Sequence, residues 1–160
     1  MTAPLSELPA AVERNGLKPP ALFVIGPTVR HAEKLDWFSR QPLAAARLVV
    51  AEGDLALAGT LEAAGAEVIA VPLPLTPASR VVLGAAPISG CVLRTPAEVD
   101  ALDEERDGVG WEEEPVAWCL GPETAARARE RGWQRVRQSA RGDNPANLVD
   151  WIGSPAGRHS

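Results

Sequence analysis

Short apolar segments alternate along this chain with stretches whose apolar residues recur at helical spacing. The first pattern is typical of buried strands and the second of helices that pack one face on a core. Strands that alternate with helices predict an α/β domain, and the crossovers between them favour parallel pairing. We therefore expect three layers, with a parallel sheet of about five strands and helices on both faces. The predicted strands are residues 47–51, 67–71, 90–93, 115–120 and 135–138.

Several helix ends can be recognised from single residues. Asp54 is a suitable cap for a helix that ends at Gly65. The sequence Thr-Pro-Ala-Glu at 95–98 matches a capping box with proline at the first helical position, which predicts a helix to about Arg106. The prolines of segment 72–77 predict an extended crossover after the second strand. Two further helices are expected, from Gly121 to Gly132 and from Asn144 to Gly153.

The residues before 47 form a different pattern. Residues 1–18 hold few large apolar side chains and predict a flexible arm or a short frayed helix. The apolar run 22–25 predicts a buried strand, and apolar positions at helical spacing predict a helix over 28–38. The expected organisation is an arm (1–18), a strand and helix (19–40), an α/β domain (47–153) and a disordered tail (154–160).

Charge is distributed unevenly over the α/β domain. The net charge is −5, yet residues 47–114 hold 13 acidic against 4 basic side chains, while residues 115–160 hold 4 acidic against 7 basic ones. The acids of 98–114 predict a solvated loop over 103–114. The arginines between 127 and 141 do not share one helix face and have no interleaved aromatic residues, so nucleic-acid binding is not expected.

Other classes of protein are disfavoured by what the sequence lacks. It has no apolar run of about 18 residues and no apolar signal core after the first residues, so we expect a cytoplasmic protein without a membrane partner. Cys91 and Cys119 lie in apolar runs, which favours buried, inert thiols over a disulfide or a catalytic thiol. His31 and His159 lack metal-ligand spacing, so no metal is expected.

Two stretches resemble enzymes of one pathway. Residues 19–38, PPALFVIGPTVRHAEKLDWF, resemble the final strand and helix of uroporphyrinogen-III C-methyltransferases. Residues 47–77, RLVVAEGDLALAGTLEAAGAEVIAVPLPLTP, and 116–136, VAWCLGPETAARARERGWQRV, resemble uroporphyrinogen-III synthases, which in many bacteria are fused behind that methyltransferase. The resemblance implies a late portion or remnant of such a fusion, working in tetrapyrrole biosynthesis.

The resemblance also implies a reaction and a site. Synthases of this family have two lobes and hold the substrate between them, whereas this chain matches one lobe. They close linear hydroxymethylbilane to uroporphyrinogen III with inversion of the last pyrrole ring, and they use no cofactor. The implied substrate-binding residues are Gly121, Pro122 and Thr124, at a helix start suited to carboxylates, with Arg94 and Thr95 at a second turn. Ordinary helix capping explains both turns equally well.

Departures from the family support a different function. Glu52 follows the first strand where the family offers an arginine, and the chain contains no tyrosine, the residue proposed to assist loss of the substrate hydroxyl. The alternative is a non-catalytic, one-lobe module that docks on uroporphyrinogen-III methyltransferase or on a linear or cyclic tetrapyrrole. A homodimer whose two lobes face each other would rebuild a cleft. A third hypothesis is a truncated gene product without function.

Overall fold

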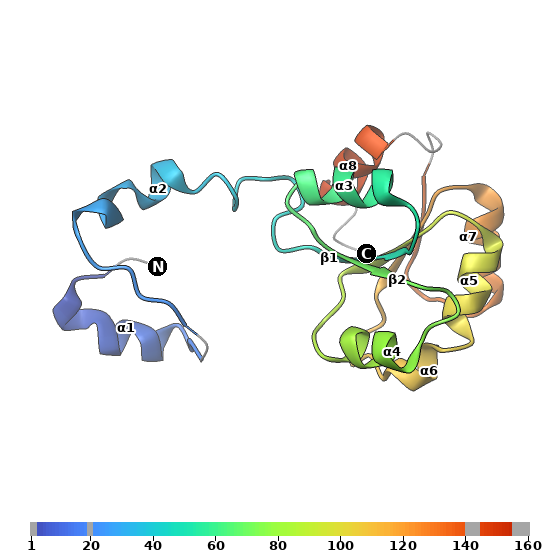
Figure 1. The fold of residues 1–160 in the computed structure, drawn as a ribbon, viewed down its shortest axis with the longest axis horizontal. Coiled ribbons are helices and arrows are strands. Elements are labelled where there is room, and N and C mark those ends of the chain that lie inside the picture. The colour runs from blue at the N-terminus through green and yellow to red at the C-terminus, as the bar shows by residue number, and fades with distance from the viewer. Residues whose placement is uncertain (1–2, 19–20, 140–144, 155–160) are drawn as a thin grey trace. The chain divides into compact units, whose positions relative to one another are not determined.

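The computed structural model describes residues 3–18, 21–139 and 145–154, which form two compact units, 1–37 and 38–160. Figure 1 shows both units, which are described separately below. The disordered tail predicted for 154–160 lies outside the described residues from residue 155 onward.

The first unit contains short helical segments and almost no core. A 3-10 turn (Leu5–Glu7) leads into α1 (Leu8–Arg14), and a second 3-10 turn (Pro27–His31) leads into α2 (Ala32–Leu35). The arm predicted over 1–18 thus contains the short helix that was its alternative. Among residues 3–18 and 21–37, Ala11 is the one buried residue.

Two expectations for the first unit were wrong. Residues 22–25 form no strand, and their side chains are exposed. A strand needs a neighbouring strand for its backbone hydrogen bonds, and none of the described segments of this unit supplies one. The helix predicted over 28–38 ends at Leu35, so Trp37 and Phe38 lie beyond it and are exposed.

The second unit is built on a five-stranded sheet with all its strand pairs parallel. The strands are β1 (Arg47–Ala51), β2 (Glu67–Val71), β3 (Gly90–Leu93), β4 (Val116–Cys119) and β5 (Val136–Gln138). Their order across the sheet is β2-β1-β3-β4-β5. The α/β class and the parallel sheet are therefore confirmed.

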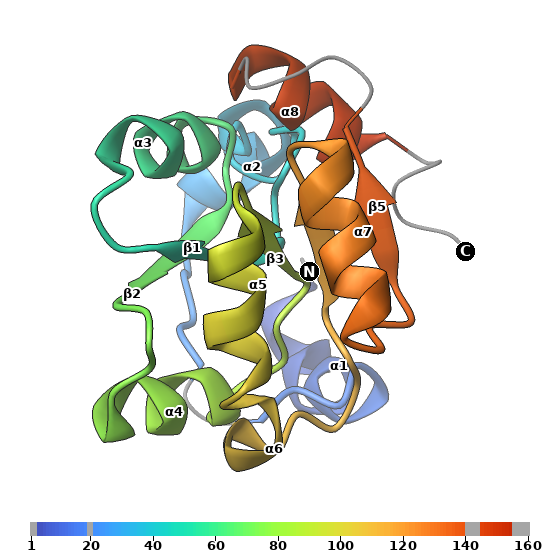
Figure 2. The ribbon, with the colours of Figure 1, turned by 90° about the vertical axis from the view of Figure 1, so that its right-hand side faces the viewer.

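Helices cover both faces of this sheet (Figure 2). On one face α3 (Leu55–Ala63) and α8 (Pro145–Gly153) pack on a core that includes Leu48, Val50 and Trp118. The other face holds a core around Val49, Cys91 and Ala117. It is covered by α4 (Pro77–Gly84), α5 (Pro96–Asp103), α6 (Arg106–Val109) and α7 (Pro122–Glu130).

Two segments of this unit differ from expectation. The crossover after β2 contains α4, because Thr76 caps that helix by accepting from the Ser79 amide and Pro77 occupies its first turn. Proline begins this helix instead of preventing one. The acidic stretch 103–114 is not simply a solvated loop. It begins with the last residue of α5 and contains α6, and its Asp103 and Glu114 both bind Arg106.

Both cysteines are buried in adjacent strands, as expected. Cys91 on β3 and Cys119 on β4 are free thiols in the same core cluster. Burial raises the pKa of Cys119 to about 11, and burial also raises the pKa of Cys91. Since the thiolate is the reactive form, neither side chain is suited to catalysis.

Candidate functional site

The sheet order reverses direction at the pairing of β1 with β3. The chain passes from β1 outward to β2, then returns past β1 to β3. In open α/β sheets ligands bind outside the carboxyl ends of the strands at such a switch point. A cavity of about 410 Å³ lies at this place. It is lined by Ala51, Glu52, Gly53, Asp54, Leu57, Val92, Arg94, Thr95 and Glu98, and it is called the carboxyl-edge cavity below.

Arg94 and Thr95, both predicted to bind substrate, lie in this cavity directly after β3. The Thr95 hydroxyl oxygen accepts from the Glu98 amide at 3.2 Å and so caps α5. The Glu98 carboxylate accepts from the Arg94 amide at 2.8 Å. The predicted capping box is present in a modified form. The Glu98 carboxylate accepts from the amide of Arg94, one residue before the cap, and not from the amide of Thr95 itself.

The guanidinium of Arg94 is bound to a carboxylate of the same cavity. Arg94 Nη1 lies 2.5 Å from Asp54 Oδ2. The other carboxylate oxygen of Asp54 accepts from the Leu57 amide at 3.2 Å and caps α3. Asp54 therefore caps α3 and also neutralises the guanidinium of Arg94, which was expected to bind an anionic substrate.

Thr124 joins the two predicted turns. Its hydroxyl donates to the carbonyl oxygen of Arg94 at 2.9 Å, and its side chain is 2% exposed. Gly121 is the N-cap of α7 in an extended conformation, and Pro122 follows at the first helical position. Gly121, Pro122 and Thr124 do not line the carboxyl-edge cavity. The hydrogen bond from Thr124 to Arg94 nevertheless holds the start of α7 beside the turn that contains Arg94 and Thr95.

The carboxyl-edge cavity carries an excess of negative charge. Glu52, Asp54 and Glu98 supply three carboxylates against the one guanidinium of Arg94. Glu52 directly follows β1, and its amide donates to the Val71 carbonyl at 2.7 Å. A ligand covered in carboxylates would meet net repulsion here.

Sequence reasoning missed an extended ion-pair network on α5, α6 and α7. Asp100 on α5 accepts from Arg127 at 2.8 Å and from Arg131 at 2.6 Å. Hydrogen bonds from Arg127, aided by those from Arg131, hold the pKa of the Asp100 carboxyl below its usual value. These two arginines therefore pair with a carboxylate of the protein itself.

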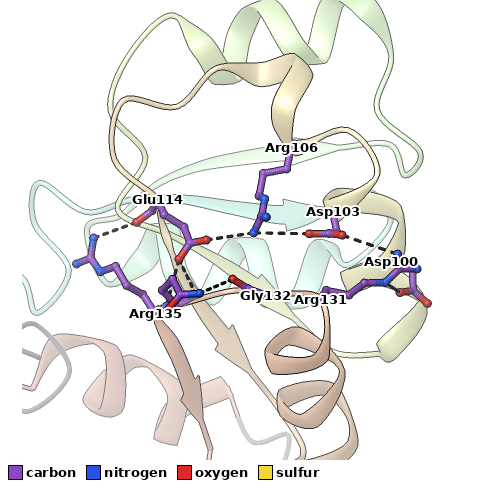
Figure 3. A network of polar contacts seen from close by, with 8 residues as sticks. Asp100, Asp103, Arg106, Glu114, Arg131, Gly132 and Arg135 are labelled. Carbon is purple, nitrogen blue, oxygen red and sulfur yellow. Dashed lines mark hydrogen bonds and ion pairs between the residues drawn. The ribbon is translucent and has the colours of Figure 1, made fainter.

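The same network continues to the start of β5 (Figure 3). Arg106 lies between Asp103 and Glu114, and Glu114 also accepts from the backbone amide of Arg135. Arg106 and Asp103 are three residues apart, but the other partners in this network are 8 to 31 residues apart in the chain. No local pattern signals pairs at such separations, so the network could not be predicted.

A second cavity, of about 490 Å³, lies at the amino ends of the strands, opposite to the carboxyl-edge cavity. It is bounded by segment 42–46 and by residues near the amino ends of β1, β3 and β4, with Trp118 and Ile152 among its apolar side chains. Its polar side chains include Glu113 and Arg135, which bind each other at 2.5 Å. The segments that line this second cavity are far apart in the sequence, and none of them carries a recognisable binding motif.

Metal ligation and membrane insertion find no support in the described residues. Within 3–18, 21–139 and 145–154, no three His, Cys, Asp or Glu side chains are grouped to hold a metal ion. The helices of those ranges are too short or too polar for any of them to cross a bilayer.

Comparison with known proteins links part of the chain to one pathway. No family model matches the sequence. A 38-residue stretch, 24% of this chain, is 50% identical to a siroheme synthase of Methylobacillus flagellatus. The chain covers only 8% of the length of that relative. The match supports a connection with tetrapyrrole biosynthesis, while membership of the uroporphyrinogen-III synthase family stays a prediction.

Replacing Thr124 by valine should destabilise the fold. The substitution leaves the Arg94 carbonyl without its buried donor, and we expect the free energy of unfolding to fall by about 1–3 kcal/mol. Urea denaturation followed by circular dichroism measures this. Thr60→Val is the matched control, because the Thr60 hydroxyl bonds within its own helix at an exposed site; it should cost less than about 0.5 kcal/mol. Equal losses for the two variants would contradict the assignment.

Proposed function

We propose that this chain is a non-catalytic accessory module of tetrapyrrole biosynthesis that docks on uroporphyrinogen-III methyltransferase. Two observations support the pathway. One is the 50% identity of 38 residues to a siroheme synthase. The other is the resemblance of residues 19–38 to the end of the methyltransferase chain.

The charge of the carboxyl-edge cavity is the observation that carries the non-catalytic part of the proposal. The substrate of the synthase reaction is covered in acetate and propionate groups. The cavity presents three carboxylates, and its one guanidinium, on Arg94, is bound to Asp54. Electrostatic complementarity between site and substrate is therefore reversed.

The composition of the sequence and the form of its α/β unit support the same conclusion. The sequence contains no tyrosine, so the acid proposed for loss of the substrate hydroxyl is missing. One five-stranded sheet forms the α/β unit, and the carboxyl-edge cavity lies on its surface. This unit by itself offers no opposing wall that would exclude water and orient a long, flexible substrate.

The exposed apolar segment 22–25 supports docking on a protein. Leu22, Val24 and Ile25 are 90%, 66% and 70% exposed. Consecutive exposed apolar residues of this kind mark interaction sites. This segment resembles the C-terminal end of the methyltransferase chain. We therefore expect it to bind the surface of the methyltransferase on which that protein's own C-terminal end packs.

Synthase activity is the second candidate, and the meeting of the two predicted turns favours it. Thr124 binds the Arg94 carbonyl, so Arg94, Thr95 and the start of α7 lie together. In this role the backbone amides of the α7 start and the Arg94 guanidinium would bind propionates. Arg94 would first have to leave Asp54.

A coupled assay separates the two candidates. Hydroxymethylbilane is generated in the presence of the purified chain, and the oxidised porphyrin isomers are separated. We expect only isomer I, formed by spontaneous closure, as in the control without protein. A parallel reaction with an active synthase shows that isomer III would be detected. An excess of isomer III from this chain would refute the non-catalytic proposal and establish a one-lobe synthase.

Docking is tested with purified uroporphyrinogen-III methyltransferase from the same organism. Sedimentation velocity should show a complex with the parent chain. Ile25→Lys should weaken it at least tenfold, because a charge would be buried in an apolar contact. Val81→Lys, an equally exposed apolar site on α4, should bind the methyltransferase like the parent. Absence of a complex, or equal weakening by both variants, would count against docking through segment 22–25.

A further inference from the structure

The outer side of β2 is an unpaired sheet edge. Among the described residues β2 pairs with β1 alone. The Glu67 amide donates to Ala46, and the Val71 carbonyl accepts from Glu52, so the odd-numbered residues of β2 bond toward β1. Since successive residues of a strand alternate, the backbone amides and carbonyls of Val68 and Ala70 point outward.

This edge lacks the features that normally prevent pairing. The strand, Glu-Val-Ile-Ala-Val, contains no proline, glycine or lysine. Its one charged residue, Glu67, lies at one end and binds Arg47 at 2.6 Å. Val68 and Ile69 are half-buried, and Ala70 is exposed. An open, apolar edge of this kind is a template for another strand.

Helices on both faces flank the same edge and carry exposed apolar side chains. In the described part of residues 38–160, the large apolar side chains that are exposed are Phe38, Leu55, Val81 and Val82. Leu55 is on α3, which precedes β2 in the chain, and Val81 and Val82 are on α4, which follows it. Figure 2 shows α3 and α4 on opposite faces beside β2.

We propose that β2 is the interface of a homodimer, in which the β2 strands of two copies pair antiparallel about a two-fold axis perpendicular to the sheet. Centred on Ile69, the pairing lets Val68 of each copy exchange both backbone hydrogen bonds with Ala70 of the other. The two five-stranded sheets become one continuous sheet. The two Glu67 side chains fall at opposite ends of the pair, so like charges do not meet.

A second copy fits this surface better than a single peptide strand. An added strand would bond to β2 but leave the flanking helices uncovered. The two-fold axis keeps each face of the sheet on its own side, so α3 meets α3 of the second copy on one face and α4 meets α4 on the other. One operation therefore pairs the backbone edge and brings the helices that carry Leu55, Val81 and Val82 to the same side of the junction as their counterparts.

This interface is independent of the proposed function and has a consequence for it. The two-fold axis reverses the strand direction between copies. The two carboxyl-edge cavities then open at opposite ends of the joined sheet and do not face each other. A dimer of this kind would not rebuild the two-sided cleft of a synthase.

Sedimentation velocity over a concentration series tests the interface. The parent chain should dimerise, and Ala70→Pro should raise the dissociation constant at least tenfold, because proline removes an outward amide without touching the bonds between β1 and β2. Val81→Lys should also weaken the dimer while leaving the fold intact, as circular dichroism would show. Ala126→Lys, at an exposed site of α7 outside the interface, should dimerise like the parent. A parent chain that stays monomeric would overturn the proposal, as would unchanged dimerisation of Val81→Lys and Ala70→Pro.

Cross-linking tests the register. In the proposed pairing the two Ile69 residues face each other without mutual hydrogen bonds, where Cα atoms lie about 4.5 Å apart and a disulfide can form. Ile69→Cys should therefore oxidise to a covalent dimer, with little interference from the buried Cys91 and Cys119. Leu22→Cys is the control for random collisions. Equal yields for the two variants would reject the register.

Discussion

The parallel pairing of β1 with β3 is the constraint on which the rest of the α/β unit depends. It joins Val49 to Cys91 and Val50 to Val92 across the centre of the sheet. Close packing accompanies it, because a Cβ at Gly90 would clash with the indole nitrogen of Trp118. The pairing sends β2 to one edge and β4 and β5 to the other. It thereby creates both the switch point with its cavity and the open β2 edge.

At that switch point, residues that serve the fold also decide the charge of the site. Asp54 caps α3 and binds the guanidinium of Arg94. The Glu98 carboxylate accepts from the Arg94 amide, and the Thr124 hydroxyl donates to the Arg94 carbonyl. Each contact stabilises a helix start or a turn. Together they use the polar groups that a carboxylate ligand would need, and this arrangement suits a protein module better than an enzyme acting on a polyanion.

Sequence patterns predicted the helices and strands whose formation depends on residues close together in the chain. The strand at 47–51 and the cap at Asp54 were expected where they occur. The segment 22–25 has an equally apolar pattern, but a strand forms only where partners exist, and sequence alone does not show partners. The α4 helix was missed because Pro77 was interpreted as a breaker when it stands in the first turn. The resemblance implied that Arg94 and Thr124 both bind substrate but did not predict the hydrogen bond between them. The bond from Arg94 to Asp54 spans 40 residues and left no local trace.

The most direct test of this account is the affinity of the chain for uroporphyrin III, measured by fluorescence quenching in the parent and in Asp54→Asn. Asparagine keeps the cap on α3 but removes the charge that holds Arg94. Glu62→Gln removes an equal charge from an exposed site of α3 and serves as the control. The account predicts negligible binding by the parent and by Glu62→Gln, and a gain of about tenfold for Asp54→Asn. Tight binding by the parent, unchanged in Asp54→Asn, would contradict it.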